Sequence, residues 1–133
     1  MVTSSRDVQP KPVRWVGSSK EDLGAFPTET RRRIGGARWD AQVGLKAAYA
    51  KPLRGFGGAG VLEIVDDFDR DTYRAVYTVR FAKAVYVLHA FQKKSKRGSA
   101  TPQSELNVID LRLKRAKKEY AQWLESGTSK TSV

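Results

Sequence analysis

The sequence predicts an α+β domain in which two N-terminal helices precede a small, mostly antiparallel sheet and a C-terminal helix. Residues 72–81 alternate between two sets of side chains, which is the period of a β-strand. Residues 84–91 are apolar at nearly every position, as expected of a central strand covered on both faces. Residues 106–123 repeat apolar side chains at spacings of three and four, which predicts an amphipathic helix.

The chain of 133 residues is expected to form one folded domain between two flexible ends. Residues 1–12 are mostly polar and hold two prolines, so they are expected to be a flexible leader. Residues 13–125 carry the apolar pattern and are predicted to be the domain. Residues 126–133 are mostly small and polar, which is typical of a flexible, frayed tail.

The first part of the domain is predicted to contain a short strand and two helices. Val13–Val16 is the strand candidate. Ser19 is placed to cap a short helix that ends near Phe26. Pro27 opens a longer helix, in which apolar residues recur at spacings of three and four as far as Ala48. We expect these two helices to form a hairpin.

Three strands are predicted after a glycine-rich loop. The first is Val61–Val65, and an acidic turn at residues 66–71 follows it. The two strands described above come next and are joined by a short link, so we expect them to form an antiparallel hairpin. The alternation places Arg74 and Arg80 on one face of this hairpin, and that face is the candidate open, concave surface.

The last helix is predicted to begin at Thr101 and Pro102, which fit its N-cap and first positions. Glu105 lies in the first turn, where a negative charge is favourable. The side opposite the apolar stripe is expected to face solvent. It carries the cations Arg112, Lys114, Arg115, Lys117 and Lys118.

The composition excludes several classes of site. The chain has no cysteine, which excludes disulfides, thiolate metal sites and cysteine nucleophiles. Its single histidine cannot supply a zinc cluster or a pair of catalytic histidines, so no metal or cofactor is expected. No apolar run approaches the roughly 18 residues of a membrane helix, and residues 1–20 lack the apolar core of a signal peptide. A soluble, cytoplasmic protein without a membrane partner is therefore expected.

The formal net charge of +11 is concentrated in one part of the chain. Residues 93–118 hold nine Lys and Arg against two acids, whereas residues 51–92 hold six against five. Such an excess predicts attraction to a nucleic-acid backbone or to an acidic protein partner. A solvated basic loop is the alternative interpretation. The densest cluster directly follows the last strand and consists of Lys93, Lys94, Lys96 and Arg97.

Five short segments, in this order along the chain, resemble the phage-derived Gp49-like branch of the HigB/RelE toxin superfamily. They are Lys51–Gly55, Leu62–Ile64, Tyr73–Tyr77, Val85–Lys94 and Thr101–Pro102. The resemblance spans about residues 13–124 and implies a RelE-like, microbial-ribonuclease-like fold. It also implies the toxin of a type II toxin–antitoxin pair, which cuts messenger RNA in the ribosomal A site. The implied partner is a helix-turn-helix antitoxin.

The resemblance also implies roles for basic residues. Arg74 matches the family's strand arginine and is expected to bind the scissile phosphate. Lys93 and Lys94 match a lysine pair at the end of the last strand, where one is expected to donate a proton or hold a phosphate. Arg54 and, more weakly, Lys51 match positions expected to contact the substrate or ribosomal RNA. Further RNA or ribosome contacts are expected from Arg80, Lys96 and Arg97.

The general acid and base are left open by the sequence. Histidine ordinarily changes its charge near neutral pH, so His89 is a candidate catalytic residue. It shares strand parity with Val87 and Phe91, and a buried core histidine is the alternative. Glu63 is a candidate base, for which the alternative is a salt bridge to Arg74 on the neighbouring strand.

Two other functions fit the same basic surface. One is a non-catalytic module that binds RNA or the ribosome, which would explain the charge without any acid–base pair. The other is a phage-derived remnant that folds and still binds an antitoxin but has lost its activity.

Overall fold

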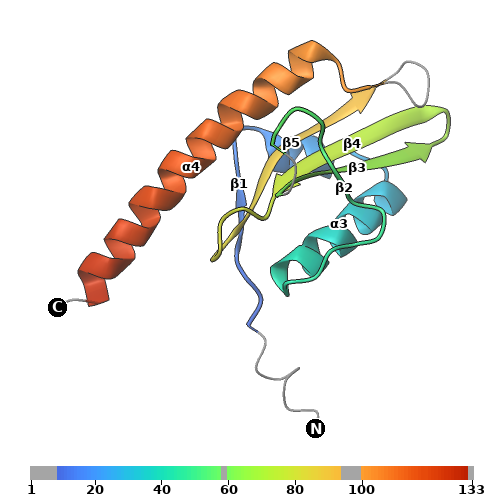
Figure 1. The fold of residues 1–133 in the computed structure, drawn as a ribbon. Coiled ribbons are helices and arrows are strands. Elements are labelled where there is room, and N and C mark those ends of the chain that lie inside the picture. The colour runs from blue at the N-terminus through green and yellow to red at the C-terminus, as the bar shows by residue number, and fades with distance from the viewer. Residues whose placement is uncertain (1–8, 58–59, 94–99, 132–133) are drawn as a thin grey trace, which may run out of the picture.

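The computed structural model describes residues 9–57, 60–93 and 100–131 (Figure 1). It confirms the predicted α+β class, with two N-terminal helices, a sheet and a C-terminal helix. The elements are β1 (Val13–Trp15), α2 (Ser19–Gly24), α3 (Thr28–Gln42), β2 (Lys51–Pro52), β3 (Val61–Phe68), β4 (Asp71–Thr78), β5 (Val85–Lys93) and α4 (Gln103–Thr131).

The sheet has five strands in the order β1-β5-β4-β3-β2. The contacts among β2, β3, β4 and β5 are antiparallel, and only β1 pairs in parallel, with β5. The prediction of a mostly antiparallel sheet is therefore confirmed. Because β5 lies between β1 and β4 and is covered on both faces, its apolar side chains are buried from Val85 to Phe91.

Helices cover both faces of the sheet. Helices α2 and α3 pack on one face, where Leu23 and Ile34 meet Tyr77 in one apolar cluster. Helix α4 packs on the other face, where Ile109 meets Leu88 in a second cluster. Figure 1 shows α3 and α4 on opposite sides of the sheet, with α4 extending well beyond it. Any functional group on the sheet must therefore lie near the edge of one of these helices.

Helix α3 is shorter than predicted. It ends at Gln42, and the residues up to Ala48 are not helical, so the prediction that it continues to that point is wrong. Gly44 adopts a left-handed φ of 84°, and the N–H of Leu45 donates to the carbonyl of Asp40 at 2.7 Å. This is a Schellman termination, in which glycine is the favoured residue because it has no Cβ.

The turn between β3 and β4 is tighter than the predicted acidic turn. Strand β3 continues to Phe68 and β4 begins at Asp71, because those two residues are cross-strand partners. The turn itself contains only Asp69 and Arg70, both with positive φ, as in a two-residue hairpin turn. The two acidic residues at 66 and 67 therefore belong to the strand.

Helix α4 begins one residue later than predicted and is longer. The carbonyl of Pro102 accepts the N–H groups of Glu105 and Leu106, so Pro102 occupies the cap position expected for Thr101. The helix continues to Thr131, beyond the expected start of the tail at residue 126. Within the described ranges, neither α4 nor any other helix combines the length and apolar character needed to span a membrane.

Candidate active site

A groove of about 780 Å³ lies where β2, β3 and β4 meet the chain segment that leads into α4. Four of its lining residues are site residues predicted from the sequence: Lys51, Arg54, Glu63 and Arg74. The segment before α4 contributes Thr101, and the first turn of the helix contributes Leu106. The structure therefore brings together on one surface residues that the sequence singled out separately.

Strand pairing explains why Glu63 and Arg74 meet. Arg74 lies opposite Val65 in the β3–β4 ladder, and Glu63 lies two residues earlier on β3. The two side chains are therefore diagonal neighbours on one face. Long side chains can reach each other across this separation. Lys51 on β2 is the cross-strand partner of Glu63, so strand pairing also places a cation at the edge of the groove.

Arg74, Glu63 and Thr101 form a closed triangle of hydrogen bonds. The Nη1 atom of Arg74 donates to Oε2 of Glu63 at 3.0 Å and to Oγ1 of Thr101 at 3.0 Å. The Thr101 hydroxyl in turn donates to the same Glu63 oxygen at 2.8 Å. The salt-bridge alternative for Glu63 is thus confirmed, and Thr101 is a site residue that the sequence suggested only as a helix cap.

The burial of Arg74 corrects one prediction about the sheet. The face that carries Arg74 was expected to be open, but Arg74 is only 4% exposed. Thr101 and α4 cover this part of the sheet, because the apolar residues of α4 need a face to pack against. Arg74 is nevertheless one of the residues that line the groove.

The groove has an excess of positive charge. Its described lining holds three cations, Lys51, Arg54 and Arg74, against one carboxylate, Glu63. Lys51 and Arg54 are exposed, so their charges are available to a ligand, whereas that of Arg74 is partly neutralised by Glu63. Such a surface attracts an anionic polymer more strongly than a neutral molecule.

Lys93 reaches the rim of the groove from β5. It lies opposite Thr72 in the β4–β5 ladder, two residues from the Arg74–Phe91 pair and therefore on the same face. Its Nζ atom donates to the carbonyl of Ala100 at 2.9 Å, and Ala100 lines the groove. The predicted residues Lys94, Lys96 and Arg97 lie outside the described residues.

His89 faces α4, because β5 carries a bulge. Val76 pairs with His89, but the next residue of β4 pairs with Val87, so Leu88 is an extra residue in β5. The predicted parity of His89 with Val87 is therefore wrong. His89 is 7% exposed, and its ring stacks on Phe91 at a centroid distance of 5.0 Å.

Two residues of α4 hold the His89 ring. The Nε2 atom lies 2.6 Å from Oε1 of Glu105, and the Nδ1 atom lies 3.2 Å from Nη1 of Arg112. Arg112 was expected on the solvent side of the helix, and that prediction is wrong. Its guanidinium also donates to the carbonyl of Leu88 at 3.0 Å. Its spacing of three residues from Ile109 and four from Ala116 places Arg112 at the border of the apolar stripe, but the bulge that it contacts is not visible in the alternation.

Arg80 lies outside the groove, next to the glycine-rich loop. Its guanidinium donates to the carbonyl of Phe56. A Cβ atom on Gly60 would lie 2.5 Å from Cγ of Arg80, so the loop can approach this side chain only with glycine there. Arg80 is exposed, but the structure does not group it with Arg74.

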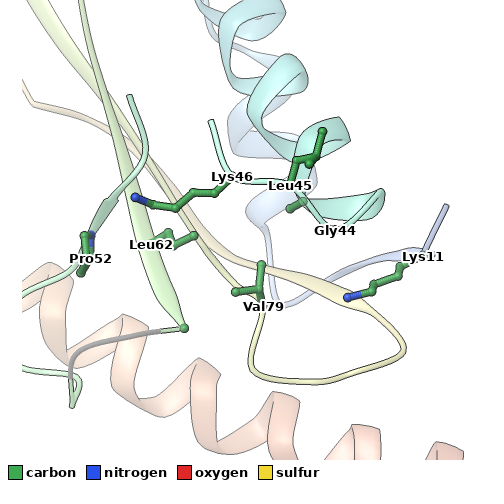
Figure 2. Close-up of a pocket in the computed structure, with 9 residues that line it drawn as sticks. Lys11, Gly44, Leu45, Lys46, Pro52, Leu62 and Val79 are labelled. Atoms are coloured by element: carbon green, nitrogen blue, oxygen red, sulfur yellow. The ribbon is translucent and has the colours of Figure 1, made fainter. Parts of the chain in front are cut away.

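A second hollow, of about 520 Å³, lies on the α3 side of the sheet (Figure 2). Its apolar residues include Leu62 and Val79. The side chain of Lys46 extends toward Pro52 and that of Lys11 toward Val79 (Figure 2). The described lining of this hollow includes none of the predicted catalytic or RNA-binding residues.

Comparison with known proteins concerns both family and fold. Residues 21–114 match the family described as phage derived protein Gp49-like (DUF891). The fold resembles the free Escherichia coli toxin RelE in a form with two arginine-to-alanine substitutions, at 18% identity and a TM-score of 0.52, over 80% of this chain and 98% of that chain. The toxin–antitoxin complex RelBE2 from Mycobacterium tuberculosis matches at 19% identity and a TM-score of 0.43, over 65% of this chain and 94% of that chain. No curated protein matches the chain.

Proposed function

The chain belongs to the phage-derived Gp49-like family, and we propose that it is the toxin of a type II toxin–antitoxin pair that cleaves messenger RNA on the ribosome. The fold that it shares with the toxin RelE supports this proposal. The observation that carries it is the groove, in which Arg74 and Glu63 lie beside the exposed cations Lys51 and Arg54. A groove with this charge suits a chain of phosphodiesters.

The proposed reaction is attack of a ribose 2′-hydroxyl on the neighbouring phosphate. It requires removal of the hydroxyl proton, stabilisation of a phosphorane with extra negative charge, and protonation of the leaving 5′-oxygen. Arg74 is the group that contacts the phosphate, because fixed cations aimed at developing charge lower the barrier. Lys93 at the rim is the candidate proton donor. Lys51 and Arg54 hold the flanking backbone.

The proposed partner is an acidic, helix-turn-helix antitoxin. A protein with a net charge of +11 needs a partner of opposite charge to neutralise it, and an acidic segment laid over the groove would cover Arg54 and Lys51 together. Because the substrate is messenger RNA on the ribosome, the proposed site of action is the cytoplasm.

Induced expression tests this function in cells. We expect growth to stop and new messenger-RNA 5′ ends to appear within translated regions. Arg74→Ala should restore growth and remove those ends. The matched control is Arg32→Ala, an exposed arginine on α3, which should remain toxic. Thermal denaturation of purified Arg74→Ala must show a folded protein, since the substitution also removes the partner of Glu63. Intact messenger RNA after induction of the original protein would contradict the nuclease proposal.

A second function is favoured by the burial of Arg74. Arg74 is 4% exposed and already bonded to Glu63 and Thr101, which is also what a purely structural arginine would show. In that case the protein binds the ribosome through Lys51 and Arg54 without cutting RNA. Growth arrest would then persist in a folded Arg74→Ala variant, no new RNA ends would appear, and a Lys51→Glu/Arg54→Glu double variant would restore growth.

A further inference from the structure

The single histidine of the chain is held between two residues of α4. Glu105 and Arg112 lie two helical turns apart, and both point to the His89 ring. The carboxylate of Glu105, an acceptor, lies at Nε2, and the guanidinium of Arg112, a donor, lies at Nδ1. This arrangement fixes where the ring proton lies.

A guanidinium can only donate hydrogen bonds, so the contact at 3.2 Å requires Nδ1 of His89 to accept. A ring that accepts at Nδ1 is neutral and carries its proton on Nε2. That Nε2–H then donates to Oε1 of Glu105 in a short hydrogen bond of 2.6 Å. The geometry thus favours a ring that accepts from Arg112 at Nδ1 and donates to Glu105 from Nε2.

Arg112 is held in place by β5 and by the segment before α2. Its guanidinium donates to the carbonyl of Leu88, in the β5 bulge, at 3.0 Å and to Oγ of Ser18, before α2, at 3.3 Å. It also lies against Gly17, where an added Cβ would come within 2.7 Å of Cζ. A guanidinium held at two other parts of the chain can set the orientation of a histidine ring.

Glu105 is the member of this chain of contacts that is adjacent in sequence to the groove lining, and it is not itself one of the described lining residues. It directly precedes Leu106 and is one helical turn from Thr101, both of which line the groove. Its side chain is 30% exposed, whereas that of His89 is 9% exposed. By contrast, Oε2 of Glu63 already accepts hydrogen bonds from Arg74 and Thr101, so this carboxylate serves to hold the arginine.

We infer that Glu105 is the general base of the proposed nuclease, with His89 and Arg112 as positioning residues. The inference rests on the proposed function. In the step, a lone pair of the 2′-oxygen forms the bond to phosphorus while Glu105 takes the hydroxyl proton. The bond from phosphorus to the 5′-oxygen breaks, and that oxygen takes a proton from Lys93. The products are a 2′,3′-cyclic phosphate and a 5′-hydroxyl, with one proton gained by Glu105 and one lost by Lys93.

Cleavage of ribosome-bound messenger RNA by purified protein tests the base. Glu105→Gln keeps an oxygen that can accept from His89 but cannot take a proton, so the single-turnover rate should fall by about 100-fold or more. The rise of the rate with pH on the acidic side should also disappear. The matched control is Asp110→Asn, an exposed carboxylate on the same helix that pairs with Lys114 and should change neither property. A Glu105→Gln rate within about threefold of the original would overturn the inference.

Nitrogen-15 NMR of the histidine ring tests the positioning without any RNA. The chain contains one histidine, so the spectrum has one imidazole to assign. We expect a protonated Nε2 and an unprotonated Nδ1 at neutral pH. Arg112→Met should release the ring into a mixture of tautomers, whereas Arg115→Met, at an exposed position on α4, should not. A proton on Nδ1 in the original protein would refute the arrangement.

The two proposals fail in different ways. If the original protein cuts RNA and Glu105→Gln cuts it equally well, the base assignment is wrong and the nuclease function stands. If the original protein arrests growth but leaves ribosome-bound RNA intact, the nuclease function is wrong, and the catalytic role of Glu105 is wrong with it.

Discussion

Arg74 and His89 lie on the same face of the β4–β5 ladder, in cross-strand pairs that are two residues apart along the strands. Arg74 pairs with Phe91 and His89 pairs with Val76, and the bulge at Leu88 is what turns His89 to this face. The Phe91 ring lies between the two, opposite Arg74 and stacked on His89. The ion-paired arginine at the groove and the Glu105–His89 pair thus lie on the same face of the sheet, the one that α4 covers.

The Arg74–Glu63 pair should be strongly coupled in stability. Glu63→Ala would leave a buried guanidinium without its carboxylate, and we expect the free energy of unfolding to fall by about 3 kcal/mol. The double variant Glu63→Leu/Arg74→Met replaces both charges with apolar groups and should lose less than the sum of the losses of Glu63→Leu and Arg74→Met. Urea denaturation of the single and double variants measures this. Strictly additive losses would show that the pair is not coupled.

Much of the fold was predictable because its strongest patterns are local. The period of two in β4, the apolar run of β5 and the stripe of α4 each reflect burial by a neighbouring layer. The end of α3 was missed, although Gly44 is a typical helix-terminating residue, because apolar residues such as Leu45 continue the helical spacing beyond it. Leu45 is 64% exposed, so that spacing was coincidental.

The candidate site was predictable from the residues only where the pairing of neighbouring strands determines which side chains meet. Arg74 was identified from the family resemblance, and its salt bridge to Glu63 was anticipated because the two residues lie on neighbouring strands. Arg112 and the orientation of His89 were not, because both depend on the bulge at Leu88 and on the packing of α4 across it. An extra residue in one strand moves every later side chain to the opposite face of the sheet. The alternation of a single sequence does not reveal such a bulge.

Two glycines on the α3 side should respond to alanine in opposite directions. Gly35 lies inside α3 with open space where a Cβ would lie, so Gly35→Ala should stabilise the protein by about 1 kcal/mol through helix propensity. Gly44 has a φ of 84° and equally open space, so Gly44→Ala should destabilise it by about 1 kcal/mol through backbone strain alone. Thermal melts of the two variants give the comparison. Equal shifts in the same direction would contradict the termination assigned to Gly44.

Stability should fall at alkaline pH because of Tyr77. Burial raises the pKa of Tyr77 from 10.0 to about 12, with smaller contributions from Tyr49 and Asp40. Below pH 10 the phenol is neutral in both states and contributes no pH dependence. Between pH 10 and about 12 the unfolded chain loses this proton and the folded protein keeps it. The free energy of unfolding should then decrease by about 1.4 kcal/mol per pH unit from this residue.

Tyr77→Phe is the variant that isolates this effect. Burial also raises the pKa of Tyr73 and of Tyr86, so some alkaline slope remains in the variant. We expect urea denaturation across the window to give a shallower decline for Tyr77→Phe than for the original protein. An unchanged slope would show that the Tyr77 phenol ionises equally easily in both states.

Arg54 should contribute to RNA affinity through charge alone. It is exposed at the groove and carries no acid–base role in the proposed reaction. Arg54→Gln should therefore weaken binding to single-stranded RNA of any sequence and reduce the slope of log K against log salt concentration by about 0.7, the value for one phosphate contact. Arg32→Gln removes the same charge from the α3 side of the sheet, so it separates local contact from net charge. If both variants lose the same slope, RNA is attracted by the total charge of the protein, and the groove is not where the backbone lies.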